Sequence, residues 1–358
     1  MPTKKTSAKK APRNAASSAP KRAGGGEPLH VGIDLGTSRS AVVASNGQRA
    51  WVESYVGWPK DFVARKMIGR PVLYGEEALR HRLSLDLVRP LENGVVRDGT
   101  ARDQEAVREL VRHLVEAVRP AEGQPIRAAV GVPAEALRTN KLAIRDAVGH
   151  YAEALMVVSE PFAVAYGLDA LDGAMVIDIG AGTTDFCVMH GTMPGEDDQR
   201  THALAGDHVD AQLRRLLEEQ YPHARFSEPA LRQLKERTAF VGEPDGRITT
   251  RGADVAQLGD YDVTDAMRHA CESLVPGIVE TALDLLSRYE PDFQEVVRKN
   301  VYLAGGGSQI RGLAAMVEAQ LSESGPTRVR VVDDALYGGA EGALALAEEM
   351  PEEYWVEV

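Results

Sequence analysis

The sequence predicts a mixed α/β protein built from two related lobes with one ligand between them. The main observation is a repeated pattern. An apolar run, a turn rich in Gly and Thr or Ser, and a second apolar run occupy residues 29–44 and again residues 175–188. The aspartates that begin the two turns, Asp34 and Asp178, lie 144 residues apart, which is a domain-sized spacing. A length of 358 residues also exceeds one ordinary hydrophobic core.

Composition places the chain among soluble globular proteins. It is 44% hydrophobic and 26% charged. Neither Cys187 nor Cys271 lies in a CxxC pair, so we expect both to be reduced core residues rather than disulfide or zinc ligands. No apolar run approaches the roughly 18 residues that span a bilayer. We therefore expect a cytoplasmic protein.

The first 27 residues differ from the rest. They hold seven Lys or Arg and one acid, whereas the whole chain carries −12, so residues 28–358 carry −18. Rich in Ala, Ser, Pro and Gly, this tail is expected to be disordered, and it lacks the apolar segment of a secretory signal. The simplest interpretation is a solubilising spacer. The alternative is contact with anionic lipid, nucleic acid or the acidic body of a neighbouring subunit, and we expect no specific nucleic-acid partner.

The two Gly-rich turns predict a phosphate clamp. They read IDLGTS at 33–38 and VIDIGAGTTD at 176–185. Glycine allows close approach of the backbone to a ligand, exposed N–H groups bind anions, and an aspartate at a strand end can hold a hydrated divalent cation. Either turn alone could simply reverse the chain. Two of them at this spacing favour phosphate binding.

The tripeptide Ser159-Glu160-Pro161 follows an apolar strand at 154–158 and begins a helix, with Pro161 suited to its first turn. The simplest role for Glu160 is a carboxylate favoured by the helix dipole. The role we favour is to orient water in line with a terminal phosphate, because the helix is expected to point at the Asp178 turn.

A third Gly-rich site follows the strand at 301–304. Gly305, Gly306 and Gly307, a capping Ser308 and a helix over 309–321 predict an anion or nucleotide cradle. The simple alternative is a tight strand-to-helix turn.

Several other segments carry structural expectations. We expect a helix over 265–289 capped by Thr264, and a close approach of the small residues at 338–343 to neighbouring backbone. Trp51, Tyr55 and Trp58 are expected to cover a sheet edge or pack in a small core, with ligand binding as the alternative. Tyr354 and Trp355 are expected to pack on the body, with a subunit contact as the alternative.

Five motifs together resemble the actin-like ATPases in content and order, over residues 28–358. They are IDLGTS (33–38), SEP (159–161), VIDIGAGTTD (176–185), LKERTAFVG (234–242) and LAGGGSQIRGL (303–313). The chain is most similar to the prokaryotic actins near MreB, and among them to those whose filaments align magnetosomes. That second similarity rests on GTSRSAVV (36–43), WPKD (58–61), SEPFAVAYGLD (159–169) and PEEYW (351–355).

The resemblance implies the actin-like ATPase fold, in which two lobes each carry a duplicated ribonuclease-H-like mixed sheet and the nucleotide lies in the cleft between them. It also implies four subdomains after the basic tail at 1–27. The lobe I core would comprise 28–60, 101–173 and 341–358, with a small subdomain at 61–100. The lobe II core would comprise 174–207 and 300–340, with a small subdomain at 208–299.

The resemblance also assigns site residues for ATP or ADP and Mg²⁺. Asp34 and Asp178 would hold the hydrated Mg²⁺, Glu160 would position the attacking water, and Asp185 would assist. The phosphates would lie against Gly36, Thr37, Ser38, Gly180, Gly182, Thr183 and Thr184. Lys235 and Glu236, which alone would be interpreted as solvated charges, would touch the nucleoside. Gly305, Gly306, Gly307 and Ser308 would form the adenosine side.

The function implied is a bacterial cytoskeletal protein that binds ATP and Mg²⁺, polymerises head to tail and hydrolyses ATP slowly to control filament turnover. Its filaments would position organelles such as magnetosomes, with the chain itself and organelle-associated adaptors as partners. The alternative is a non-polymerising ATP-binding adaptor or a phosphotransferase of the same superfold. A kinase would need a base facing a second substrate, and a membrane-tethered adaptor an amphipathic anchor, for which PEEYWVEV is too short and acidic.

Overall fold

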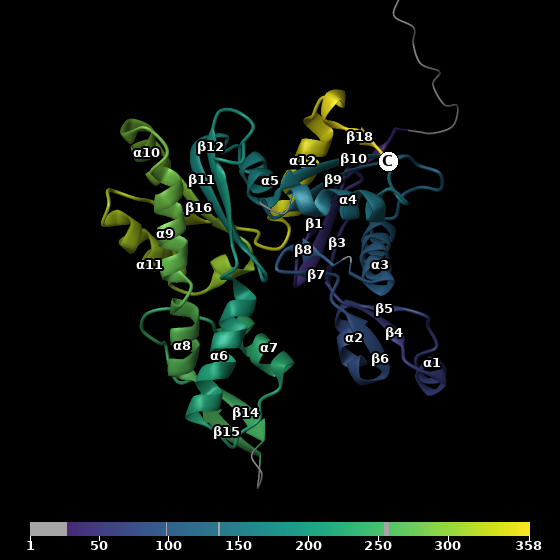
Figure 1. Cartoon of the computed structure of the whole chain (residues 1–358), viewed down its shortest axis with the longest axis horizontal. Coiled ribbons are helices and arrows are strands. Elements are labelled where there is room, and N and C mark those ends of the chain that lie inside the picture. Colours follow the sequence, from purple (N-terminus) through teal and green to yellow (C-terminus); the bar gives the residue numbers. More distant parts are fainter. Residues whose placement is uncertain (1–26, 98, 135–136, 254–257) are drawn as a thin grey trace, which may run out of the picture.

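A computed structural model describes residues 27–97, 99–134, 137–253 and 258–358. Figure 1 shows two lobes side by side, each with a smaller part that projects in the same direction. The basic tail lies almost wholly outside the described residues. Among the described residues, no helix combines the length and the apolar character needed to cross a bilayer.

Lobe I is built on a six-stranded mixed sheet. Its order is β18-β10-β9-β1-β2-β3, with β1, β9 and β10 parallel to one another. Most residues of β1 are buried, because helices cover both faces of the sheet. The strands are β1 (Leu29–Leu35), β2 (Arg39–Ala44), β3 (Arg49–Glu53), β9 (Ile126–Val132), β10 (Ala154–Ser159) and β18 (Val356–Glu357).

Lobe II repeats this plan in a five-stranded sheet of order β13-β12-β11-β16-β17. An antiparallel meander is again followed by parallel strands, so the predicted repeat is confirmed. Asp34 lies near the end of β1 and Asp178 near the end of β11, at equivalent places in the two sheets. The strands are β11 (Asp172–Ile179), β12 (Thr184–His190), β13 (Gln199–His202), β16 (Val301–Ala304) and β17 (Val329–Val331).

Helices fill the space around and between the sheets. In lobe I these are α3 (Ala101–Ala117), α4 (Leu137–Val148), α5 (Glu160–Gly167) and α12 (Gly338–Glu349), and in lobe II α9 (Val275–Leu286), α10 (Pro291–Arg298), the 3₁₀ turn η3 (Gly306–Gln309) and α11 (Leu313–Ser322). Helices α5 and α12 pack on each other and contribute to an apolar cluster shared by the two lobes. The small residues of α12 permit this contact, as the sequence predicted.

The smaller part of lobe I contains a three-stranded sheet of order β5-β4-β6. Because β4 belongs to this sheet, the part begins before the predicted boundary at 61. Its elements are β4 (Val56–Pro59), α1 (Phe62–Ile68), β5 (Leu73–Tyr74), α2 (Gly75–Arg80), η1 (Arg82–Ser84) and β6 (Leu85–Val88), and the hairpin β7 (Leu91–Glu92) and β8 (Val95–Val96) leads back to the lobe.

The smaller part of lobe II is mainly helical. It contains α6 (Gly206–Gln220), α7 (Glu228–Thr238), α8 (Thr264–Glu272) and the two-stranded ribbon β14 (Thr249–Ala253) and β15 (Leu258–Asp262). The prediction of a single helix over 265–289 was wrong. This segment divides into α8 and α9, because proline in the first turn of α9 cannot continue a preceding helix.

Thr264 does not cap α8, since the N-cap residue is Val263 and makes no side-chain cap bond. The Thr264 Oγ1 instead accepts a hydrogen bond from the Ile248 N–H at 2.8 Å. The expectation for the cysteines is confirmed, because both are free and buried.

The aromatic residues divide between core and surface. Trp58 is buried, whereas Trp51 is 42% exposed and lies under the Arg39 guanidinium. Near the C-terminus, the short turn η4 (Glu352–Tyr354) precedes Trp355, which packs against the body beneath Arg127, as predicted. Tyr354, for which the same packing was predicted, is exposed instead.

Candidate functional site

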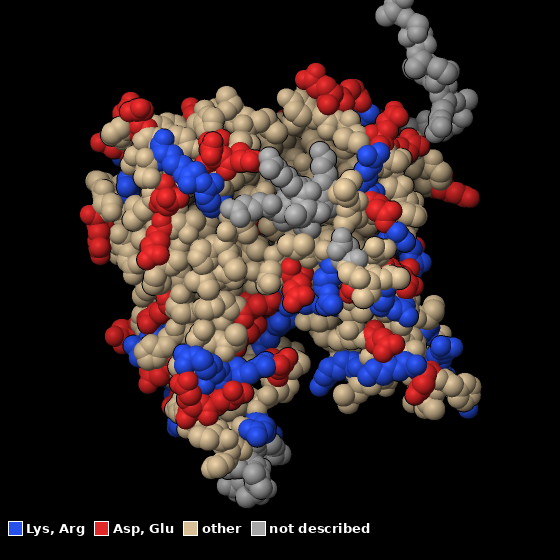
Figure 2. Space-filling view, in the orientation of Figure 1, with Lys and Arg blue, Asp and Glu red and all other residues tan. Residues whose placement is uncertain are grey.

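A cavity of about 730 Å³ lies between the two lobes, and most of the predicted site residues line it. Figure 2 shows the notch between the two smaller parts, flanked by charged side chains. The predicted residues that line the cavity are Asp34, Gly36, Thr37, Ser38, Glu160, Asp178, Gly180, Gly182, Thr183, Lys235, Glu236, Gly305, Gly306 and Gly307.

The two Gly-rich turns touch each other across the cavity floor. A Cβ atom at Gly182 would lie 2.5 Å from Thr37 Oγ1, so a larger residue would push the two turns apart. Thr37 Oγ1 also accepts a hydrogen bond from the Gly94 N–H at 3.0 Å, which brings the β7–β8 hairpin turn to the same point. The two turns predicted to bind phosphate, which are distant in the sequence, therefore lie against each other and form one continuous surface.

Three half-buried carboxyl groups face this surface, and each has a raised pKa. Burial raises the pKa of Asp34 to about 7. Burial, then the charges of Asp34 and Asp185, raise the pKa of Asp178 to about 8. Burial, then the charges of Asp34, Asp185 and Asp178, raise the pKa of Glu160 well above its ordinary value. These groups repel one another, so together they favour a cation.

The donor set fits a hydrated Mg²⁺. Among the described residues, no three His, Cys, Asp or Glu side chains come together closely enough to enclose a metal ion by themselves. Mg²⁺ commonly uses only one or two protein carboxylates and completes its shell with water and phosphate oxygens. Asp34 and Asp178, at equivalent strand ends in the two lobes, would supply that pair.

Lys235 and Glu236 lie at the side of the cavity where the nucleoside was predicted. The Lys235 ammonium donates to the Gly206 carbonyl at 2.8 Å and pairs with Asp210 at 2.9 Å. Glu236 pairs across the cavity with Arg39 at 2.7 Å. Lys235 is therefore held at the cavity by protein partners, whereas Glu236 is exposed and meets Arg39 at the cavity.

Gly305 brings the third Gly-rich turn to the same cavity. Its φ of 72° suits glycine, and a Cβ atom there would lie 2.2 Å from the Asp178 Oδ1. The turn and one of the predicted metal ligands are therefore in direct contact.

Three predicted residues do not line the cavity. Thr184 is fully buried and donates to the Leu204 carbonyl at 2.8 Å. Asp185 accepts from the Ala134 N–H at 2.9 Å and from Thr201 Oγ1 at 2.6 Å, so it ties a strand of lobe II to the backbone of lobe I.

Ser308, the third of these residues, donates to the Gly305 carbonyl at 2.7 Å. It does not cap the following helix, because it lies within the 3₁₀ turn Gly306–Gln309, whereas α11 begins at Leu313 with Gly312 as its N-cap. Its hydroxyl instead holds the Gly-rich turn in shape.

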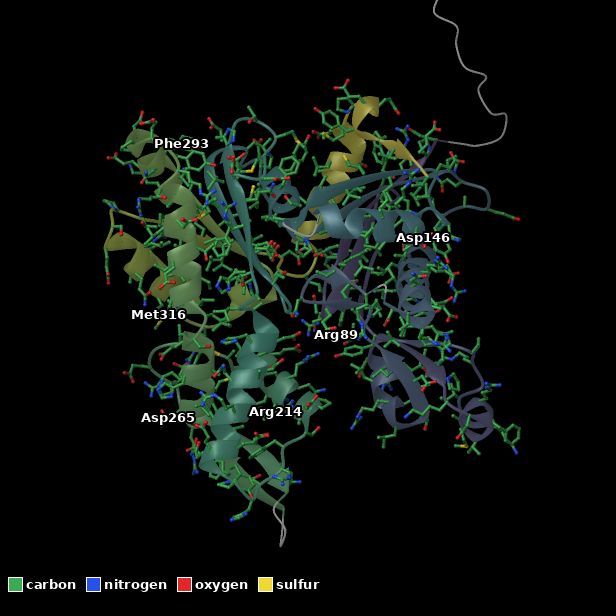
Figure 3. The ribbon with its side chains drawn as sticks, in the orientation of Figure 1. Arg89, Asp146, Arg214, Asp265, Phe293 and Met316 are labelled. Atoms are coloured by element: carbon green, nitrogen blue, oxygen red, sulfur yellow. The ribbon has the colours of Figure 1, made fainter. Side chains whose placement is uncertain are left out.

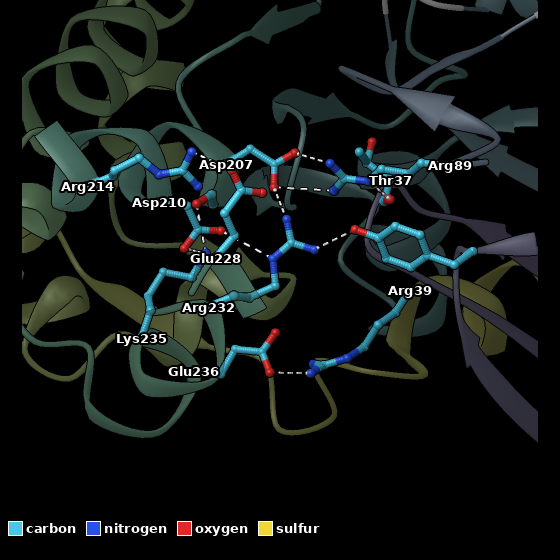
Figure 4. Close-up of polar contacts among 12 residues, drawn as sticks. Thr37, Arg39, Arg89, Asp207, Asp210, Arg214, Glu228, Arg232, Lys235 and Glu236 are labelled. Carbon is cyan, nitrogen blue, oxygen red and sulfur yellow. Dashed lines mark hydrogen bonds and ion pairs between the residues drawn. The ribbon is translucent and has the colours of Figure 1, made fainter. Parts of the chain in front are cut away.

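A charged network that sequence reasoning missed joins the lobes beside the cavity (Figure 4). Its partners are 118 to 197 residues apart in the chain, so no local pattern pairs them. The members that cross between lobes are Arg39, Tyr55, Arg89, Asp207, Arg232 and Glu236.

Sequence comparison identifies close relatives over nearly the whole chain. The model of the MreB/Mbl protein family matches residues 28–354. The actin-like protein MamK of Paramagnetospirillum magneticum is 41% identical over 91% of this chain and 94% of its own length. MamK of Magnetospirillum gryphiswaldense is 41% identical, with 92% of each chain covered. The cell shape-determining protein MreB of Escherichia coli is 25% identical over 71% of this chain and 74% of its own length.

Solved structures agree with the sequence comparison. The MamK double helical filament matches with a TM-score of 0.88 at 40% identity, over 91% of this chain and all of that one. A non-polymerising MamK mutant bound to AMPPNP matches with a TM-score of 0.69 at 40% identity, over 90% of this chain and 99% of that one. With the predicted fold and an inter-lobe cavity in place, these matches show that the chain is an actin-like protein and belongs to the MreB/Mbl family.

Proposed function

We propose that this protein binds ATP and Mg²⁺ between its lobes, polymerises head to tail into cytoplasmic filaments, and hydrolyses ATP slowly to time filament turnover. We further propose that these filaments position magnetosomes. The observation that carries the proposal is the contact between Thr37 and Gly182, which joins phosphate-binding turns of both lobes over three carboxyl groups. The MamK relatives, one in a filament and one bound to AMPPNP, support both nucleotide binding and polymerisation.

Each part of the site has a role in this proposal. The backbone N–H groups of residues 36–38 and 180–183 would donate to the phosphates. Asp34 and Asp178 would hold a hydrated Mg²⁺, which when bound offsets the negative charge of phosphates and carboxylates. Glu160, at the start of α5, would accept a hydrogen bond from the attacking water and orient it toward the terminal phosphate.

The residues on the nucleoside side would set the position of the ligand in the cavity. Lys235 and Glu236 would contact the ribose and base from α7, and the Gly305–Gly307 turn would lie against the adenosine. Asp185 would assist indirectly, because its bond to the Ala134 N–H holds the two lobes together beside Glu160.

Polymerisation would follow from the two-lobed shape. A ligand that touches both lobes favours their closed arrangement, and a head-to-tail contact between identical subunits gives an open filament. Loss of the terminal phosphate would remove contacts shared by the lobes and weaken the filament. We also propose four subdomains, with the smaller part of lobe I beginning at β4 rather than at residue 61 and the smaller part of lobe II ending before α9. We further propose organelle-associated adaptors as partners, and contact of the basic tail with anionic surfaces.

The test compares the wild type with Glu160→Ala by pelleting and negative-stain microscopy in ATP, ADP or no nucleotide. We expect filaments with ATP, and longer persistence of filaments in the variant, because it would bind ATP but hydrolyse it slowly. Glu348→Ala, which removes an exposed carboxylate from α12, is the control and should behave as the wild type.

Absence of filaments under every condition, with ATP still bound, would contradict the filament proposal. The function would then be that of a non-polymerising adaptor or a phosphotransferase of the same fold. Equal filament lifetimes in wild type and Glu160→Ala would instead contradict the role of Glu160.

A further inference from the structure

Four of the side chains that join the two lobes form one connected group beside the nucleotide cavity (Figure 4). Tyr55 and Arg89 come from lobe I, and Asp207 and Arg232 come from lobe II. We call these four residues the inter-lobe clasp. Figure 3 shows Arg89 at the inner edge of the gap between the two smaller parts, with Arg214 on the opposite side.

Arg89 makes the central contact of the clasp. Its two Nη atoms donate to the two carboxylate oxygens of Asp207, at 2.7 and 3.2 Å. Its Nε donates to the Thr37 carbonyl at 2.7 Å. One planar guanidinium thus bonds both lobes at once, which the fork of an arginine allows and the single ammonium of a lysine does not.

Both partners of Arg89 are tied to the phosphate clamp. Thr37 belongs to the first phosphate-binding turn. Asp207 is attached to the second turn, because its N–H donates to the Ala181 carbonyl at 2.7 Å and the neighbouring Gly206 N–H donates to the Gly180 carbonyl at 3.0 Å. Arg89 therefore connects the backbones of the two phosphate-binding turns through a single side chain.

Arg232 provides a second connection beside the first. Its Nη1 donates to the Tyr55 hydroxyl at 3.0 Å, and its Nη2 lies 3.4 Å from the Asp207 carboxylate. The side chains of Arg89 and Arg232 are 21% and 27% exposed. Partly buried pairs of this kind are screened less by salt than exposed pairs and contribute more to stability.

The clasp belongs to an arrangement of lobes that resembles the filament. At the same 40% identity and nearly equal coverage, the chain superposes better on the MamK filament than on the non-polymerising mutant bound to AMPPNP. The two matches differ mainly in geometry rather than in sequence. The contacts of Arg89 and Arg232 are therefore observed in the lobe arrangement nearer to that of the polymer.

We propose that Arg89 is a positioning residue that couples the two phosphate-binding turns and, with the rest of the clasp, holds the lobes in the arrangement that polymerises. The part that concerns polymerisation rests on the proposed function. Subunits without the clasp spend less time in that arrangement. Because only the competent fraction assembles, the concentration needed for assembly must rise by the factor by which that fraction falls.

The first measurement is the critical concentration for ATP-dependent assembly, taken from pelleting over a range of protein concentrations. Arg89→Gln is expected to raise it about tenfold, as for the loss of a partly buried pair. Arg89→Lys should give an intermediate value, because lysine keeps the charge opposite Asp207 but cannot also bond the Thr37 carbonyl. Arg214→Gln is the matched control and should stay within about twofold, because Arg214 pairs with Glu228 inside lobe II only.

The second measurement reports the lobe arrangement without polymerisation or turnover. Met67→Cys and Arg251→Cys place dyes on exposed positions in α1 and β14, near the far ends of the two smaller parts (Figure 1). The native cysteines are buried and should not label. Below the critical concentration and with ATP, Arg89→Gln should lower energy transfer between the dyes, and Arg214→Gln should not.

The two measurements separate this proposal from the proposed function. If the wild type fails to polymerise, the filament proposal fails, but the energy-transfer result still tests the clasp. If Arg89→Gln leaves energy transfer unchanged, or changes it no more than Arg214→Gln does, Arg89 does not hold the lobes and the proposal is overturned. If energy transfer falls but the critical concentration stays within twofold of the wild type, the link to polymerisation is overturned.

Discussion

At the scale of single residues, the site brings several carboxyl groups close together. Without a ligand, this clustering lowers the stability of the folded state. Asp34, Glu160 and Asp178 are half-buried, and burial and mutual repulsion raise their pKa values. A carboxyl whose pKa is higher in the folded than in the unfolded state binds more protons when folded. The contribution of these three groups to the unfolding free energy without ligand therefore falls as the pH rises from about 4 to about 8. This cost to the folded state is consistent with the proposed role of these residues in ligand binding rather than in stability.

Asp178→Asn tests this balance. At pH 8, without nucleotide, the variant should melt about 2–4 °C above the wild type, because it lacks the buried charge. At pH 4 the difference should vanish, because the native carboxyl is then protonated. Thermal unfolding measured across this pH range checks both expectations, with Asp172→Asn, an exposed position on the same strand, as the control. A variant less stable than the wild type at pH 8 would contradict the argument.

At the scale of elements, one helix crossing depends on the absence of side chains. Helices α5 and α12 approach so closely that a Cβ atom at Gly342 would lie 1.8 Å from the Ala163 carbonyl oxygen. A further Cβ at Gly32 in β1 would meet the α12 backbone at Ala340. Gly342 in α12 and Gly32 in β1 therefore set how near this helix lies to α5 and to the sheet, whose β1–β2 turn is the first of the two proposed phosphate-binding turns.

Gly342→Ala should lower stability by about 1–3 kcal/mol or more, because the backbone of α5 must move to admit the methyl group. Gly338→Ala is the matched control in the same helix, where the nearest atom to an added Cβ is 3.8 Å away. Denaturant unfolding of the two variants gives the comparison. Equal stabilities would show that the crossing tolerates a wider spacing than the structure indicates.

At the scale of the whole molecule, the ligand is expected to stabilise both lobes together, since the cavity is lined by segments from each. Below the critical concentration, ATP with Mg²⁺ at 100 times its dissociation constant should add about 2.7 kcal/mol to the unfolding free energy. ATP with EDTA should add much less, because the carboxylates then face the phosphates without a cation. Equal thermal shifts with and without EDTA would contradict the metal site at Asp34 and Asp178.

Sequence alone determined the parts of this protein that are encoded by neighbouring residues. The two phosphate-binding turns, the duplication of the sheet and the third Gly-rich turn each lie within a few consecutive residues, so hydrophobic pattern and turn chemistry were sufficient to predict them. Most of the candidate site followed, because its residues belong to these turns. The resemblance to actin-like ATPases supplied their assignment to metal, phosphate and nucleoside.

Only the tertiary structure decided which polar side chains meet. In the tertiary structure Arg89 bonds Asp207 and Arg232 bonds Tyr55. Asp185 and Ser308 form hydrogen bonds with backbone groups, and the helix expected over 265–289 is two helices. An ion pair between residues 118 positions apart has no local signal in the sequence, because its partners are chosen by the packing of whole lobes. Local patterns therefore specify the two halves of the nucleotide site, and the docking of the lobes specifies how the halves are joined.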